Sequence, residues 1–112
     1  MKLKKSLLAG CAALAFGVAT PALSNVVGDT ITLGSSISLT GKYATNGLHT
    51  QRGYDYAVQV INDAGGVTVG GKSYKLAVKY YDDESTPARG AQLAERLIQQ
   101  DGIEYMLGPY SS

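Results

Sequence analysis

The stretch TITLGSSISLTGKYATNG, residues 30–47, joins a strand pattern to a polar loop that contains two glycines. Apolar residues alternate at positions 31, 33, 37 and 39, which predicts a strand over residues 30–39. From residue 48 onward the apolar residues recur at helical spacing, which predicts a helix. A strand that leads through a polar loop into a helix is typical of an α/β protein.

The same alternation of strand and helix continues along the chain. Gly65 and Gly66 end the first predicted helix, and residues 65–72 predict a turn with a short extended excursion. Residues 74–82 alternate and predict a second strand. Thr86 and Pro87 are typical of a helix start, and this second helix is expected to end near residues 101–102. Residues 103–107 then predict a third strand.

This βαβαβ order predicts right-handed crossovers and a parallel sheet with helices on both faces. If the first strand lies between the second and the third, the topological switch point falls between the first and third strands. Ligands of open α/β sheets bind outside the carboxyl ends of the strands at such a point. The loops of residues 39–47 and 108–112 should therefore face one crevice.

The side chains expected at this crevice offer hydroxyl and amide groups without a dedicated cation. Ser111 and Ser112 are the strongest candidates, since a helix starting after them would add free amides and a positive dipole end, a good receptor for a carboxylate. Serines also commonly cap helices, and the two roles are compatible. The other candidates for hydrogen bonds or stacking are Ser38, Thr40, Tyr43, Thr45, Asn46 and Tyr110.

The N-terminal residues have the pattern of a secretory signal. Three lysines precede an apolar run over residues 7–19, and small residues at 22 and 24 suit a signal peptidase. The run of 13 residues is shorter than the roughly 20 that span a membrane. We therefore expect residues 1–24 to be removed, which leaves 25–112 as part of one domain. A lipid anchor at Cys11 is the less favoured interpretation, because the apolar run continues beyond it.

The charge balance does not suggest a nucleic-acid partner. The whole chain has ten basic and nine acidic residues. Removal of Lys2, Lys4 and Lys5 leaves seven basic against nine acidic residues, a net charge of −2. Cys11 is the only cysteine, so the processed chain would contain no disulfide.

Four motifs, in their order and spacing, resemble those of the type 1 periplasmic substrate-binding proteins of ABC transporters, in the leucine/isoleucine/valine-binding branch. They are LTG with the glycine of position 47, INDAGG at residues 61–66, YDD at 81–83 and LGPYSS at 107–112. The resemblance extends from about residue 31 to residue 112. It implies a two-lobed protein that closes on an amino acid or a similar small acid, with this chain as the first half of lobe one.

The resemblance also implies roles for individual residues. The position of Ser112 typically binds the ligand α-carboxylate, and Tyr110 and Ser111 line the pocket. Asn46 occupies a position that often packs on the ligand side chain, where other members carry a bulky aromatic residue. The implied partners are the small-molecule ligand and a membrane permease, with no cofactor and no enzymatic activity. A chain without the second lobe is expected to bind weakly.

Three alternatives compete with this interpretation. Asp82, Asp83 and Glu84 could offer oxygen ligands to a metal, although neighbouring strand residues point to opposite faces and a solvated strand end or helix cap fits better. Ser111 or Ser112 with His49 could form a hydrolytic pair, but the glycines that flank a nucleophile elbow are absent. The same fold could also serve as the ligand-sensing domain of a membrane receptor or regulator.

Overall fold

The computed structural model describes residues 26–110. The predicted signal segment and the two C-terminal serines, Ser111 and Ser112, lie outside the described residues. Two long strands form the centre of the fold, β2 (Thr30–Ile37) and β4 (Lys72–Asp82). They pair in parallel over their common length, from Thr30 opposite Lys75 to Ile37 opposite Asp82. The predicted first and second strands are therefore confirmed as parallel neighbours, although β2 ends two residues earlier than predicted.

Residues 103–107 lie beside the other edge of β2, as the predicted strand order requires. The Gly34 amide donates to the Tyr105 carbonyl at 3.0 Å, and the Leu107 amide donates to the Gly34 carbonyl at 2.8 Å. This makes a single parallel bridge between Gly34 and Met106, so the prediction of a full third strand is wrong for the described residues. Pro109 explains where the ladder stops, because the next bond would need an N–H group that proline lacks.

Two short antiparallel strands widen the sheet. Neither of them was predicted from the sequence as a strand of the sheet. β1 (Val26–Val27) pairs with the start of β2, and β3 (Val67–Val69) pairs with β4, giving the order β1-β2-β4-β3. The β3–β4 hairpin turns at Gly70 and Gly71, where φ is +57° and +80°. Two consecutive residues with positive φ suit glycine, which confirms the predicted turn with a short excursion. The sheet is thus mixed, with its parallel pair at the centre.

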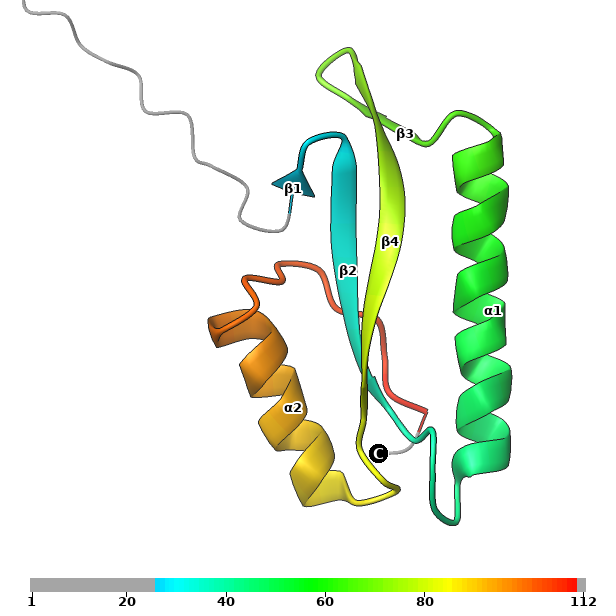
Figure 1. Cartoon of the computed structure of the whole chain (residues 1–112), viewed down its shortest axis with the longest axis vertical. Coiled ribbons are helices and arrows are strands. Elements are labelled where there is room, and N and C mark those ends of the chain that lie inside the picture. Colours follow the sequence, from blue (N-terminus) through cyan, green and yellow to red (C-terminus); the bar gives the residue numbers. More distant parts are fainter. Residues whose placement is uncertain (1–25, 111–112) are drawn as a thin grey trace, which may run out of the picture.

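The two helices cover opposite faces of the sheet, as predicted. α1 (Ala44–Asp63) and α2 (Pro87–Gln99) lie on opposite sides of the central strands in Figure 1. The adjacent tyrosines of β4 point to opposite faces: the Tyr80 hydroxyl donates to Asp55 of α1 at 2.7 Å, and the Tyr81 hydroxyl donates to Asp101 just after α2, also at 2.7 Å. No helix within residues 26–110 is long and apolar enough to cross a membrane.

The fully buried apolar core is small and lies mainly under α2. Ile37 and Leu97 have no exposed surface, and Ile103 is 4% exposed. Within α2, Leu97 is fully buried, whereas the neighbouring Ile98 is 53% exposed. Along α1 the only buried residue is Gly47. Large apolar side chains therefore remain exposed on both helices, among them Tyr56 and Val60 on α1 and Ile98 on α2.

Candidate functional site

The two predicted loops meet at the carboxyl end of β2. The Asn46 side-chain amide donates to the Tyr110 hydroxyl at 2.6 Å. The rings of Tyr43 and Tyr110 lie 6.3 Å apart with a tilt of 60°, an arrangement within the favourable range for aromatic pairs. The ammonium group of Lys42 lies 4.6 Å from the centre of the Tyr43 ring. We call Lys42, Tyr43, Asn46 and Tyr110 the tyrosine cluster.

The loop that carries Tyr110 is held against the α1 face by a shared acceptor. The carbonyl oxygen of Gly108 accepts the Tyr54 hydroxyl at 2.9 Å and the Ser35 hydroxyl at 3.4 Å. Tyr54 lies in α1 and Ser35 lies in β2, so helix and sheet both fix the same peptide group. This contact brings Tyr110 toward Asn46 of α1.

The start of α1 approaches β2 closely at Gly47. A side-chain carbon at this position would lie 1.6 Å from the carbonyl oxygen of Ser38. α1 begins at Ala44, four residues earlier than predicted, so Gly47 belongs to the helix rather than to the preceding loop. The missing side chain allows the first turn of α1 to pack on the strand end, which places Asn46 near Tyr110.

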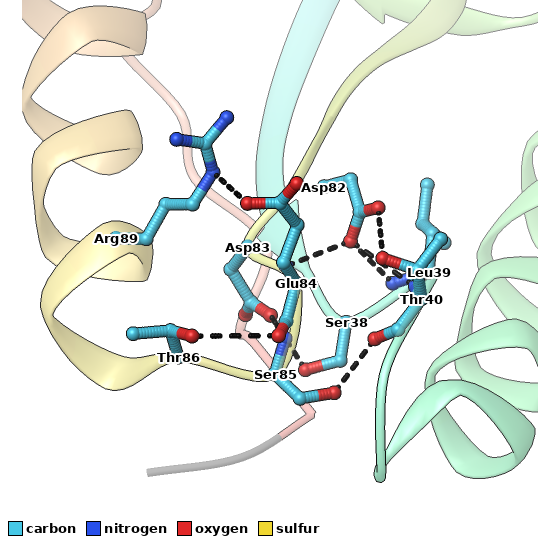
Figure 2. Close-up of polar contacts among 9 residues, drawn as sticks. All are labelled: Ser38, Leu39, Thr40, Asp82, Asp83, Glu84, Ser85, Thr86 and Arg89. Carbon is cyan, nitrogen blue, oxygen red and sulfur yellow. Dashed lines mark hydrogen bonds and ion pairs between the residues drawn. The ribbon is translucent and has the colours of Figure 1, made fainter.

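Asp82 at the end of β4 anchors the loop that follows β2. Figure 2 shows its carboxylate facing Leu39 and Thr40. It accepts the Leu39 amide at 3.0 Å, the Thr40 amide at 3.2 Å and the Glu84 amide at 2.9 Å, and its second oxygen accepts the Thr40 hydroxyl at 2.7 Å. Partial burial alone would raise the pKa of Asp82, but these hydrogen bonds outweigh it and hold the pKa below its usual value.

Asp83 makes a second link between the same loops. It is 3% exposed, and its carboxylate accepts the Ser38 hydroxyl at 2.6 Å and the Ser85 amide at 2.8 Å. Ser38 has no exposed surface, and the Thr40 hydroxyl is bonded to Asp82. The parallel strand ends therefore bring both hydroxyls against the acidic pair, and the expectation that the Ser38 hydroxyl faces a ligand crevice is wrong.

The acidic residues 82–84 stabilise the loops that follow β2 and β4. Asp82 and Asp83 accept hydrogen bonds from the chain, and Glu84 pairs with Arg89 at 2.8 Å. Within residues 26–110 no group of three His, Cys, Asp or Glu residues could hold a metal ion. The sequence prediction missed this anchoring role. The available signal was an acidic pair at the end of one predicted strand, together with a hydroxyl-rich loop after the neighbouring predicted strand.

Thr45 and His49 are exposed residues of α1, and the structure gives neither a bond to the tyrosine cluster. Ser111 and Ser112 lie outside the described residues, so their predicted contacts and the proposed pairing with His49 stay predictions.

A separate cavity of about 250 Å³ lies on the α2 face of the sheet. Its lining is mainly small and apolar, and none of Tyr43, Asn46 or Tyr110 contributes to it. Ser36 lines this cavity, and its buried hydroxyl has no hydrogen-bond partner among the described residues. The residues that line it are Ser36, Asp83, Pro87, Gly90, Ala91, Ala94, Met106, Leu107 and Pro109.

Comparison with known proteins identifies the class to which this fold and loop arrangement belong. Residues 30–112 match the family described as "Periplasmic binding protein". The Leu/Ile/Val-binding protein homolog 3 of Brucella melitensis is 37% identical over 78 residues, which are 70% of this chain and 20% of that protein. The Leu/Ile/Val-binding protein of Escherichia coli K12 is 33% identical over 104 residues, 93% of this chain and 25% of that protein.

A solved structure agrees with these sequence matches. The branched-chain amino acid transporter substrate-binding protein LivJ of Streptococcus pneumoniae, in complex with isoleucine, matches with a TM-score of 0.63 and 32% identity. The match covers 71% of this chain and 22% of that one. The chain belongs to the periplasmic binding protein family, and its relatives are Leu/Ile/Val-binding proteins. It spans about a fifth to a quarter of their length.

Proposed function

We propose that this chain is the N-terminal part of an extracytoplasmic binding protein that captures a branched-chain amino acid, or a similar small carboxylate or amide, for import by an ABC transporter. The observation that carries the proposal is the meeting of Tyr43, Asn46 and Tyr110 at the carboxyl end of β2. It occurs in a chain whose relatives are named for leucine, isoleucine and valine. Carboxyl ends of strands at a switch point are where α/β folds bind ligands.

The chemistry of the cluster suits a small amphipathic ligand. The rings of Tyr43 and Tyr110 offer apolar faces for an aliphatic side chain, while the phenol and the Asn46 amide offer hydrogen bonds. Ser111 and Ser112 follow Tyr110 directly, and in this proposal their hydroxyls and amides receive the ligand carboxylate, Ser112 foremost. Each group acts by binding alone, so the proposal requires neither a cofactor nor a catalytic step.

The proposal includes a location outside the cytoplasm and a membrane partner. Residues 1–24 would direct export and be cleaved after Ser24, with lipid attachment at Cys11 as the less favoured route. The loaded protein would deliver its ligand to a membrane permease. We favour this over a receptor-bound sensing domain, because LivJ is named as the substrate-binding protein of a transporter.

A hybrid protein tests the proposal. Residues 26–112 of this chain would replace the aligned N-terminal part of the E. coli Leu/Ile/Val-binding protein, whose remainder supplies the second lobe. We expect calorimetry to detect binding of L-isoleucine, L-leucine or L-valine at micromolar or better affinity and no binding of L-lysine. A folded hybrid that binds none of the three would refute the proposed function.

A matched pair of variants in the hybrid tests the site. Tyr110→Phe keeps the ring but removes the hydroxyl that accepts from Asn46. Loss of one hydrogen bond, worth about 1 kcal/mol net, predicts an affinity loss of about fivefold. Tyr56→Phe removes the same group from a tyrosine of α1 that is 70% exposed, and it should leave the affinity unchanged. Equal affinities for the two variants would exclude the Tyr110 hydroxyl from the site.

A further inference from the structure

A serine outside the tyrosine cluster makes a direct contact with its backbone. Ser85 lies in the turn between β4 and α2, where its φ is +61° and that of Glu84 is +54°. L-residues with side chains rarely adopt this left-handed conformation, and it concentrates where the surrounding structure demands it. At Ser85 the conformation aims the hydroxyl across to the loop that precedes α1.

The Ser85 hydroxyl bridges two peptide groups of that loop. It donates to the carbonyl oxygen of Thr40 at 2.7 Å and accepts the amide of Tyr43 at 3.0 Å. Tyr43 is the N-cap residue of α1 and makes no side-chain capping bond of its own. Amides at the start of a helix have no partner within the helix, so the Ser85 hydroxyl supplies one.

The loop is shaped to receive this contact. Gly41 lies between the two bridged peptide groups with a φ of +83°. A side-chain carbon there would lie 2.7 Å from the Ser85 hydroxyl oxygen and 2.9 Å from the Glu84 carbonyl oxygen. Both contacts are closer than side-chain carbons tolerate, so the bridge requires glycine at position 41.

Asp82 and Ser85 together hold the loop from its first residue to its last. Asp82 accepts the amides of Leu39 and Thr40, and Ser85 accepts that of Tyr43. The Tyr43 carbonyl in turn accepts the amide of Gly47 at 2.9 Å, in the first turn of α1 that carries Asn46. The contacts therefore run in sequence from the β4 turn to the tyrosine cluster.

We infer that Ser85 is a positioning residue for the tyrosine cluster, which sets the place of the Tyr43 ring through its bond to the Tyr43 amide, with Asp82 fixing the preceding residues. Only the statement that the cluster binds an amino acid rests on the proposed function. A general loop anchor would change the stability of the whole chain evenly. A positioning residue changes the Tyr43 region more than the β2–β4 ladder.

Amide hydrogen exchange and ring NOEs, measured by NMR on the 112-residue chain, test this inference. In the unmodified chain the Tyr43 amide should be protected although no helical bond covers it, and an unprotected Tyr43 amide would overturn the inference without any variant. In Ser85→Gly, which keeps the left-handed backbone but removes the hydroxyl, we expect Tyr43 exchange to rise at least about fivefold relative to the β2–β4 amides. The Tyr43–Tyr110 ring NOE should weaken.

Glu84→Gly is the matched control. It relaxes the neighbouring left-handed residue and removes an exposed ion pair, yet leaves the backbone amide that bonds Asp82. Tyr43 exchange and the ring NOE should equal those of the unmodified chain. The inference fails if the two variants behave alike or if Ser85→Gly speeds all amides by one factor. Because no amino acid is present, the result is independent of whether the cluster binds one.

Discussion

Gly47→Ala is the substitution for which the structure makes the strongest stability prediction. A methyl group at Gly47 would lie 1.6 Å from the Ser38 carbonyl oxygen and 2.7 Å from its carbonyl carbon. A carbon and an oxygen normally approach no closer than about 3.3 Å, so α1 and the end of β2 must separate by about 1.7 Å. The obstacle is backbone, which cannot rotate away as a flexible side chain would.

Two opposing effects set the size of the change. Alanine has a better helix propensity than glycine by about 1 kcal/mol, which would stabilise α1. Overpacking costs about 1–3 kcal/mol, and a clash this severe belongs at the upper end. We therefore expect a net loss of about 2 kcal/mol in the free energy of unfolding. With an m-value of about 1 kcal/mol/M for a small protein, the urea midpoint should fall by about 2 M.

Gly53→Ala provides the matched control within the same helix. A methyl group at Gly53 meets nothing within 4 Å, so only the helix propensity changes, and stability should rise by about 0.5–1 kcal/mol. The assay is urea unfolding of both variants followed by far-ultraviolet circular dichroism. If Gly47→Ala is as stable as the unmodified chain, the close approach of α1 to β2 is wrong.

Three further predictions concern single polar groups. The folded-state pKa of Asp82 lies below its usual value, so the ionised carboxylate should stabilise the fold above about pH 4, and this effect should be lost as the pH falls through the folded-state pKa. Asp82→Asn should therefore make the urea midpoint depend less on pH in the acid range, and a pH dependence equal to that of the unmodified chain would contradict this. Burial raises the pKa of Tyr80, and its bond to the Asp55 carboxylate raises it further, so one phenol should resist ionisation above pH 10 in an absorbance titration and Tyr80→Phe should abolish that resistant fraction. Ser36→Ala removes a buried hydroxyl without a partner among residues 26–110, so urea unfolding should show no loss of stability and a gain of up to about 1 kcal/mol, whereas a loss of that size would reveal a missing partner.

The sequence predicted the order of elements because periodicity and glycine placement are local signals. The alternation in residues 30–39 and the glycine pairs near residues 65 and 70 each depend on a few neighbours in the chain. The early start of α1 was not predictable in this way. Gly47 looks like a loop residue from its neighbours, and it enters the helix because of a tertiary contact with Ser38.

The meeting of the two loops was predictable from the sequence, whereas the partners of their hydroxyl groups were not. The topology rule correctly brought the loops of Tyr43 and Tyr110 together, since it depends only on strand order. It could not assign hydroxyl partners. Ser38 and Thr40 bond to Asp83 and Asp82 because the β2–β4 register places the two strand ends side by side, and that register is a property of the folded sheet.

A crystal structure of the hybrid protein with L-isoleucine would show directly whether the tyrosine cluster binds the ligand. We predict that the ligand lies at the tyrosine cluster, with its aliphatic side chain against Tyr43 and Asn46 and its carboxylate within hydrogen-bond distance of Ser112. An isoleucine bound elsewhere, for example in the cavity beside Ser36, or a carboxylate held away from Ser112, would contradict the assignment of this site.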